Sequence, residues 1–190
     1  EVQALNVGQS LTDTFTVATF DGTTQTVTVA IQGANDAATL GGTVTGSVTE
    51  LGVSNAGVAT ATGTITSVDA DNTADLFTAS SGSTSHGTYT MGTGGAWSFS
   101  INDSNSQVQA LNVGQSLTDT FTVTSVDGTS QTVSVVIQGS NDAASVGGAI
   151  TGTVTEAGGV GNATANTPVF SGTLTSADAD NTADLFAAST

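Results

Sequence analysis

The chain has 190 residues and a formal net charge of −16, with sixteen acidic residues, one histidine and neither Lys nor Arg. Without cations it cannot displace counterions from phosphates, which excludes binding to nucleic acid and to anionic membrane surfaces. It also contains no Cys, which excludes thiol catalysis, zinc thiolate sites and disulfides, and no apolar run approaches the length that inserts into a membrane.

Long identical stretches show that the sequence is built from repeats. Residues 2–17 are identical to residues 108–123, which lie 106 positions later, and the same offset links Glu50 to Glu156. Repetition over this length predicts tandem domains rather than a short-period solenoid. We expect one complete repeat at 37–142, the C-terminal part of a preceding repeat at 1–36, and the N-terminal part of the following repeat at 143–190.

Within the complete repeat, short runs alternate apolar and polar residues with a period of two, which is typical of half-buried strands. Trp97 and Phe99 alternate with serines, which predicts that both rings lie in the core. Residues 92–95 are predicted to form a glycine-rich turn, and at most one helical turn is expected, near residues 108–111. The predicted strands are residues 43–49, 59–67, 76–79, 88–91, 96–101, 118–124 and 132–138.

These strands define the expected fold class. They are separated by Gly, Asn and Asp turns, and one long connection spans residues 102–117. The pattern fits an Ig-like or cadherin-like β-sandwich. We therefore predict an all-β protein made of tandem sandwich repeats of about 106 residues.

An acidic run is the most distinctive feature of the sequence. Residues 69–75 read Asp-Ala-Asp-Asn-Thr-Ala-Asp and recur unchanged as residues 178–184. Carboxylates this close repel one another unless a cation neutralises them, and Ca²⁺ prefers such oxygen ligands. The run is not an EF-hand loop, because Ala74 and Ser80 stand where that loop needs Gly and Glu. A solvated polar loop is the alternative interpretation of the motif alone.

Alternating strand directions place the acids of the complete repeat at its two ends, and we expect none of them in the middle of a strand. Asp127 falls at the end near residue 37, and Asp13 is expected to face that end from the preceding repeat. The second junction then gathers more than enough oxygens for the six to eight ligands of one Ca²⁺ site, or for two or three sites, and without metal the charges would leave the linker loose. The predicted metal ligands are Asn35, Asp36, Asp69, Asp71 and Asp75 at the first junction, and Glu50, Asp103, Asp119, Asn141, Asp142, Asp178, Asp180 and Asp184 at the second.

Several motifs resemble the VCBS-type repeats of giant bacterial surface adhesins. They are Leu111-x-x-Gly-x-x-Leu-Thr-Asp-Thr-Phe-Thr-Val123, then Asp127-Gly128, then Ile137-x-Gly-x-Asn-Asp142. The run Gly94-Gly-Ala-Trp-Ser-Phe99 is similar to that family's Gly-x-Trp-x-Tyr element, with Phe99 in place of Tyr. The Asn141-Asp142 linker, Asp178, Asp180 and Glu50 also match cadherin calcium motifs. The cadherin linker is longer, whereas Ala143-Ala144 follow here.

The resemblance implies a function outside the cell. It implies cadherin-like repeats with Ca²⁺ at their junctions, whose partners are neighbouring repeats of the same chain or adjacent copies in a fibre. Such a chain would be a structural extender module of a type I secreted, RTX-type adhesin. That adhesin would act at the bacterial cell surface, holding cells to surfaces or within biofilms.

The sequence is also compatible with a second class of function. A ligand-binding module for glycan or ice is the alternative, because Thr-x-Thr spacings such as Thr60-Ala-Thr62 resemble ice-binding faces. An enzyme is not expected, since His86 is the one possible general base. It is read as a loop histidine within residues 80–88, with no evident nucleophile beside it. Near-identical copies favour the spacer over recognition.

The partial repeats carry an expectation of their own. Neither 1–36 nor 143–190 contains all of the predicted strands, so each would expose apolar residues such as Phe15, Val29, Leu185 and Phe186. We expect either that the molecule continues beyond both ends or that partial sandwiches complete one another between neighbouring chains, since open sheet edges recruit strands.

Overall fold

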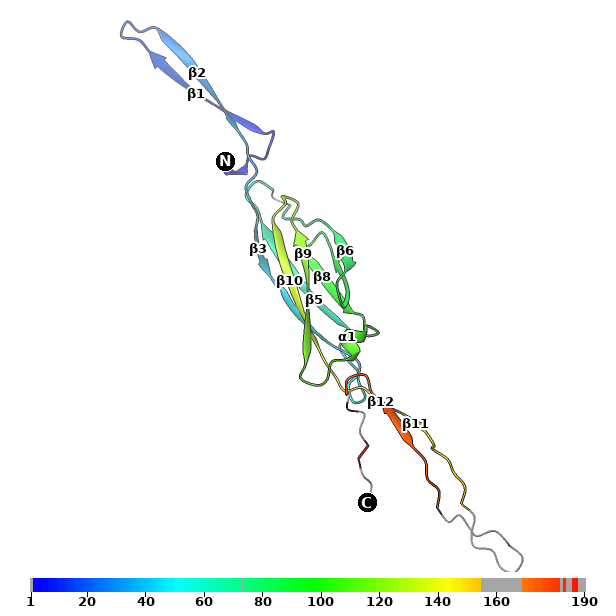
Figure 1. Cartoon of the computed structure of the whole chain (residues 1–190). Coiled ribbons are helices and arrows are strands. Elements are labelled where there is room, and N and C mark those ends of the chain that lie inside the picture. The colour runs from blue at the N-terminus through cyan, green and yellow to red at the C-terminus, as the bar shows by residue number, and fades with distance from the viewer. Residues whose placement is uncertain (1, 73, 155–168, 182, 184–185, 188–190) are drawn as a thin grey trace, which may run out of the picture.

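The chain forms an all-β structure with almost no helix (Figure 1). The computed structural model describes residues 2–72, 74–154, 169–181, 183 and 186–187. No helix in this part of the chain is long and apolar enough to cross a membrane. In order, the elements are a 3-10 helix Val2–Ala4, β1 Ser10–Ala18, β2 Thr24–Gln32, β3 Thr39–Gly42, β4 Thr45–Thr49, β5 Thr60–Val68, β6 Ser80–Ser83, β7 Gly87–Met91, β8 Ala96–Ile101, α1 Ser106–Gln109, β9 Ser116–Thr124, β10 Ser130–Gln138, β11 Ser145–Gly148 and β12 Leu174–Ala177.

Two sheets make up the body of residues 37–142. One has five strands in the order β3-β5-β8-β7-β6, and the other has three in the order β4-β10-β9. All pairings are antiparallel except β4 with β10, which run parallel from Thr45↔Ser134 to Thr49↔Gln138. The parallel pair is important for function because it brings the C-terminal ends of two strands to the same end of the body.

The first strand of the body changes sheets part-way along. The strand predicted over residues 43–49 matches β4 within two residues, but β3, just before it, was not predicted and lies in the five-stranded sheet. The switch falls at Gly42, whose φ of 93° is in the region that favours glycine. A Cβ at Gly42 would meet the Thr64 carbonyl oxygen at 2.4 Å, so the close approach also requires glycine. Just after it, the Thr43 N–H still donates to the Thr64 carbonyl oxygen at 2.8 Å.

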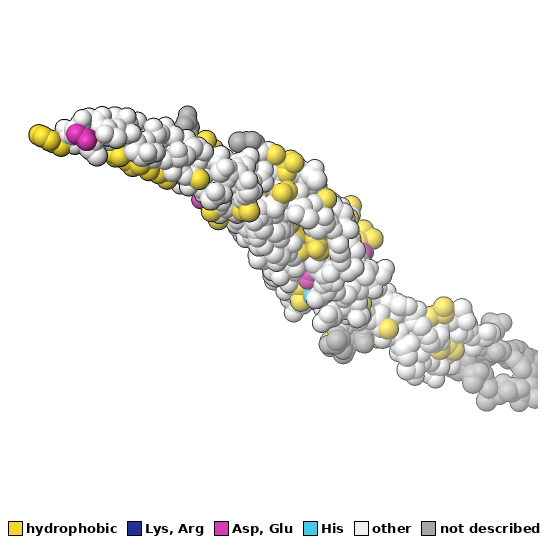
Figure 2. All heavy atoms as spheres, turned by 90° about the horizontal axis from the view of Figure 1, so that it is seen from above, with side chains coloured by type: hydrophobic (Ala, Val, Ile, Leu, Met, Phe, Trp, Pro, Cys, Tyr) yellow, Lys and Arg dark blue, Asp and Glu magenta, His cyan; other side chains and the backbone are white. Residues whose placement is uncertain are grey.

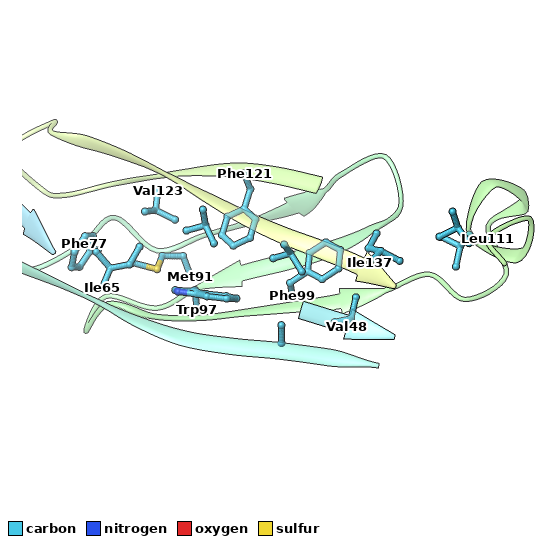
Figure 3. Packing of buried hydrophobic residues seen from close by; sticks show 14 residues of the cluster. Val48, Ile65, Phe77, Met91, Trp97, Phe99, Leu111, Phe121, Val123 and Ile137 are labelled. Atoms are coloured by element: carbon cyan, nitrogen blue, oxygen red, sulfur yellow. The ribbon is translucent and has the colours of Figure 1, made fainter. Parts of the chain in front are cut away.

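The space between the two sheets is filled by apolar side chains (Figure 3). As predicted, Trp97 is in this core, with 2% of its surface exposed, and so is Phe99. The Trp97 Nε1–H donates to the Thr43 carbonyl oxygen at 2.7 Å. The indole ring packs edge-on against Phe121 of the facing sheet, with 5.8 Å between the ring centroids. A Cβ at Gly63 would lie 2.6 Å from the indole, so this glycine makes room for the ring.

Two other local predictions need correction. Residues 76–79 are not a strand. Phe77 instead forms an isolated bridge with Ser125 and buries its ring in the core, and the next strand is β6. The helical turn is centred slightly earlier than predicted, at Ser106–Gln109, with Asn105 as its N-cap. The remaining predicted strands match β5, β7, β8, β9 and β10 within two residues at each end.

The β1–β2 hairpin repeats the pairing of β9–β10 without its burial. The register Phe15↔Val27 corresponds to Phe121↔Val133 in the repeated sequence. Phe15 is nevertheless 54% exposed, whereas Phe121 is 5% exposed. Figures 1 and 2 show this hairpin at one end of the body, with apolar side chains on its surface, and β11–β12 at the other end.

Phe186 is likewise half exposed, and Leu185 lies outside the described residues. What covers these side chains, whether a longer chain or a neighbouring one, stays a prediction.

Replacing Trp97 by Ala should lower the free energy of unfolding by about 3–5 kcal/mol, the loss typical of a large buried aromatic ring. The matched control is Val113→Ala, because Val113 is exposed and its truncation removes little packing. Urea denaturation followed by circular dichroism measures both. Equal stability of the two variants would show that the indole does not support the core.

Candidate functional site

The parallel pairing of β4 and β10 builds one acidic junction. Glu50 directly follows β4, and its N–H donates to the Gln138 carbonyl oxygen at 3.1 Å. Its carboxylate reaches across to the residues that follow β10, where Oε1 accepts the Ser140 N–H at 2.7 Å. Asp103 follows β8, which ends at the same end of the body, and its Oδ1 accepts the Leu51 N–H at 3.0 Å. Glu50, Asp103 and the linker residue Asp142 therefore come together.

The segment after β12 joins this junction from the other side. Asp178 directly follows β12, and the Oδ2 of Asp180 accepts the Asp142 N–H at 3.3 Å. The Asn112 side-chain amide donates a hydrogen bond to the Asp180 carbonyl oxygen at 3.5 Å. The predicted second-junction residues Glu50, Asp103, Asp142, Asp178 and Asp180 thus meet, although they are spread over more than half of the sequence.

Three carboxylates of this junction, those of Glu50, Asp142 and Asp180, have raised pKa values, and burial is the largest cause for each. Burial raises the pKa of Glu50 above its usual value. The negative charges of Asp142, Asp103 and Asp180 add to this, against the opposing hydrogen bond from Ser140. The pKa of Asp142 is also raised, mainly by burial and then by the negative charges of Asp180, Asp103 and Asp178.

The pKa of Asp180 is raised first by burial and then by Asp178. The site therefore resists full ionisation unless positive charge is supplied.

Four buried carboxylate oxygens at this junction have no hydrogen-bond donor. They are Glu50 Oε2, Asp142 Oδ2, Asp178 Oδ1 and Asp180 Oδ1, and the Glu50 side chain is fully buried. Unpaired buried acceptors are destabilising, and a bound cation is one partner that would satisfy them together. Their chemistry, all oxygen and mostly carboxylate, fits Ca²⁺. Among the described residues, no three acidic or histidine side chains already converge into a metal cage. Binding would therefore require these side chains to draw together.

The first junction repeats part of this arrangement. The Asp36 N–H donates to Asp71 Oδ2 at 3.1 Å, as Asp142 does to Asp180, and Asp71 Oδ1 is a further buried oxygen without a donor. Burial and the neighbouring Asp71 raise the pKa of Asp69. Asp75 has a loop-forming role, because its Oδ1 accepts the Asp69 N–H at 2.8 Å and its φ is 48°.

The linker amides and three other acids have different surroundings. The Nδ2 groups of Asn35 and Asn141 each donate to the carbonyl oxygen of the following aspartate, at 2.8 and 2.6 Å. Asp13 lies exposed on β1, where it accepts the Thr14 N–H. Asp127 accepts the Ala38 N–H at 2.8 Å and so ties the β9–β10 turn to the linker. Asp184 lies outside the described residues.

Asp119 is the clear departure from the predicted placement. It is the fourth residue of β9 and is 3% exposed, so the expectation that no acid lies in the middle of a strand is wrong. Its Oδ2 accepts the Thr84 hydroxyl and, at 2.9 Å, the His86 N–H. Its Oδ1 lies 2.6 Å from His86 Nδ1. Both oxygens are occupied by protein groups away from the junction acids.

His86 lies in the turn between β6 and β7, as predicted, but its pairing with Asp119 was missed. The ring is buried, with 7% of the residue exposed. Burial raises the pKa of Asp119, but hydrogen bonds from Thr84 and His86 outweigh it and lower that pKa overall. One sequence signal pointed to this: Asp119 alternates with Leu117, Phe121 and Val123, which places it on the inward face of the strand.

Comparisons with known proteins add no family assignment. No protein-family model matches the chain, and no curated protein matches it either.

The raised carboxylate pKa values set the expected pH dependence of the metal-free protein. A raised folded-state pKa stabilises the fold at low pH, and that stability is lost as pH rises through the raised values. The melting temperature without calcium should therefore fall as pH increases from about 4, near the usual pKa of Asp and Glu, towards neutrality.

The variant Glu50→Gln isolates the contribution of Glu50, because it keeps the side chain's size and removes its ionisation. We expect the melting temperature of this variant to fall less steeply with pH than that of the parent, as measured by thermal circular dichroism across that pH range. Identical profiles for the parent and Glu50→Gln would show that Glu50 ionises without opposition.

Proposed function

We propose that the chain is a stretch of tandem Ig-like or cadherin-like β-sandwich repeats whose junctions are stiffened by Ca²⁺. The carrying observation is the set of four buried carboxylate oxygens without donors. Glu50 and Asp142 bring two of them from the repeat at 37–142, and Asp178 and Asp180 bring two from the segment beyond it. Ligands contributed from both sides of a linker make metal binding and domain orientation one event.

The residues that would hold the ion can be named from their placement. Glu50, Asp103 and Asp142 would bind from one repeat, and Asp178 and Asp180 from the next. Bound Ca²⁺ would supply positive charge that offsets the mutual repulsion of these groups. The contacts of Asp142 and Asn112 with Asp180 already hold the two segments next to each other, which lowers the ordering needed on binding.

The sheet arrangement supports the sandwich interpretation. Two sheets face each other across one core, and the first strand is shared between them through β3 and β4. The β1–β2 and β9–β10 hairpins have the same register in repeated sequence, which supports tandem repeats. With the VCBS-type motifs, these features favour an extender module of a type I secreted bacterial surface adhesin, working in cell adhesion, biofilm or an extracellular fibre.

A ligand-binding module is the second candidate, and one surface favours it. Hydroxyl side chains line up across the outer face of the five-stranded sheet, where Thr62 pairs with Ser98 and Ser98 with Thr90 around a shallow hollow. Stacking of a sugar on Trp97 is disfavoured, because its ring is buried. Glycan-array and ice-affinity measurements on the chain test this candidate, and binding in either would favour recognition over a passive spacer role.

The proposed role is not enzymatic. His86 is the chain's single histidine, and its two ring nitrogens face buried Asp119 and the side chain of Gln107. That arrangement supports a structural role for the imidazole rather than general-base catalysis on an external substrate.

Calcium should raise the melting temperature of the chain. Binding to the folded state alone adds about 3 kcal/mol of stability when free calcium is a hundredfold above its dissociation constant. Differential scanning calorimetry with calcium and with chelator gives the comparison, and magnesium at the same concentration is the control for charge screening. An unchanged melting temperature in calcium would remove the ion from the proposal.

Replacing Asp178 and Asp180 together by Ala should loosen the junction while leaving the core of residues 37–142 intact. The reason is that both side chains act across the linker. Small-angle X-ray scattering in calcium should show a broader distance distribution for this variant than for the parent. The control removes two charges elsewhere, with Asp13→Ala and Asp21→Ala on the β1–β2 hairpin. A double variant as rigid as the parent would contradict the proposed ligand set.

A further inference from the structure

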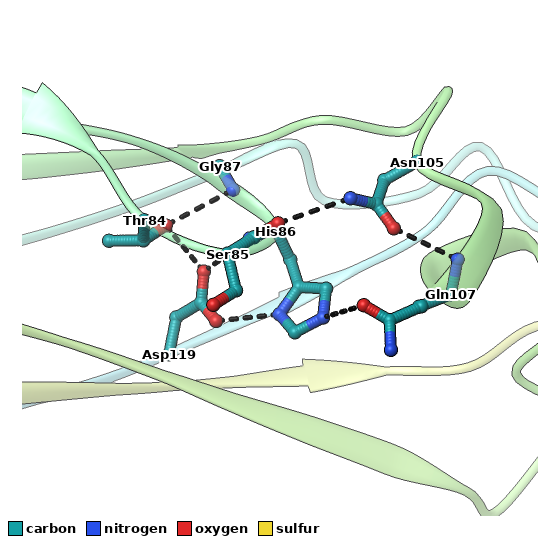
Figure 4. Close-up of polar contacts among 7 residues, drawn as sticks. All are labelled: Thr84, Ser85, His86, Gly87, Asn105, Gln107 and Asp119. Atoms are coloured by element: carbon teal, nitrogen blue, oxygen red, sulfur yellow. Dashed lines mark hydrogen bonds and ion pairs between the residues drawn. The ribbon is translucent and has the colours of Figure 1, made fainter.

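A buried polar cluster links three parts of the fold that are distant in sequence (Figure 4). His86 comes from the β6–β7 turn, Asp119 from β9 and Gln107 from α1. His86 Nδ1 lies 2.6 Å from Asp119 Oδ1, and His86 Nε2 lies 3.2 Å from Gln107 Oε1. Thr84 donates its hydroxyl to Asp119 and accepts the Gly87 N–H at 3.1 Å, so the turn itself is fixed as well.

The turn that carries His86 holds the long connection between β8 and β9. The Asn102 N–H donates to the His86 carbonyl oxygen at 2.8 Å, and Asn105 Nδ2 donates to the Ser85 carbonyl oxygen at 3.1 Å. Asn105 in turn caps α1, because its Oδ1 accepts the Gln107 N–H at 2.9 Å. Together with the contact between His86 and Gln107, these bonds fix the start of the connection.

The same connection supplies two groups to the acidic junction. Asp103 comes directly after Asn102 and binds the Leu51 N–H beside Glu50. Asn112, further along, reaches the Asp180 carbonyl oxygen. A shallow hollow lined by Asp103, Gln109 and Asp142 shows that α1 also borders the junction. The position of the connection therefore decides where two of the junction's polar groups lie.

The cluster is not explained by core packing alone. A buried carboxylate is stable only when it is paired, and His86 is the only residue of the chain that can carry a side-chain positive charge. An apolar pair at these positions would fill the same volume without fixing the orientation of the turn. The polar pair also sets the orientation of the turn. The carbonyl oxygens of that turn accept hydrogen bonds from the Asn102 N–H and the Asn105 side-chain amide.

We propose that His86, held by Asp119, is a positioning residue for the calcium junction. It contacts none of the proposed ligands directly. It fixes the connection after β8 so that Asp103 faces Glu50 and Asp142. This inference rests on the proposed calcium function, because it assigns the cluster a role at that site.

The test compares calcium affinity among full-length variants by isothermal titration calorimetry. His86→Ala should weaken calcium binding about tenfold or more, as the loss of groups that orient metal ligands does. His86→Asn should retain most of the affinity, because its amide can donate to Asp119 from nearly the position of Nδ1. Glu50→Gln identifies the second-junction site, since the binding that it removes belongs to this junction.

A matched control separates positioning from general loosening. Trp97→Phe removes the hydrogen bond to Thr43 and leaves every hydrogen bond of the His86 cluster in place. Calcium affinity should be unchanged in Trp97→Phe. Equal weakening in Trp97→Phe and His86→Ala, or parent-like affinity in His86→Ala, overturns the inference. If His86→Ala does not fold, Gln107→Ala replaces it, because Gln107 is exposed and its loss breaks only the link to α1.

Hydrogen–deuterium exchange in chelator gives a readout that does not depend on calcium. The amides of Asn102 and Gln107 should exchange faster in His86→Ala and stay protected in Trp97→Phe. If the parent binds no calcium, the proposed function and this inference both fail. If the parent binds calcium and His86→Ala binds it equally well, the inference alone fails.

Discussion

Repulsion between carboxylates is the constraint on which the junctions depend. The chain carries sixteen acidic residues and no Lys or Arg, so no side chain other than His86 can offset a negative charge. At the second junction, burial makes the repulsion stronger, because water no longer screens charges that lie in the interior. The raised pKa values of Glu50, Asp142 and Asp180 express this conflict. In the proposed function, a divalent cation would offset this repulsion and so stiffen the junction.

The strand that changes sheets is what brings these charges together. Because β3 and β4 belong to different sheets, β4 can run parallel to β10, and both strands then end at the same end of the body. Glu50 and Asp142 therefore meet, although about ninety positions separate them. With a single uninterrupted strand in the five-stranded sheet, Glu50 would not lie beside the residues that follow β10.

Much of this arrangement follows from the sequence, and the exceptions have identifiable causes. Period-two patterns located β5, β7, β8, β9 and β10, and the predicted meeting of Glu50, Asp103 and Asp142 agrees with their placement. β3 was missed because its four residues include one large apolar side chain, Leu40, and the switch between sheets depends on the backbone at Gly42. Residues 76–79 show alternation too, but Phe77 is inserted into the core from a loop. Asp119 was placed at the end of the body because its strand was expected to begin at residue 118, whereas β9 begins at Ser116 and carries Asp119 on its inward face.

The repeated hairpins show how far local sequence determines structure. β1–β2 and β9–β10 share almost the same residues and the same register, so strand pairing is encoded within the hairpin itself. Burial is not encoded within the hairpin, since Phe15 is exposed whereas Phe121 is covered by the five-stranded sheet. Most of the free energy of burying these faces therefore comes from strands elsewhere in the repeat. The same division holds at the junctions. The acidic run at 69–75 is closed locally, through the bond between Asp75 and Asp69. Its contact with Asp36 comes from 35 positions earlier in the chain. Order within the loop and order across the junction thus have separate physical origins, and in the proposed function calcium would act on the second without being needed for the first.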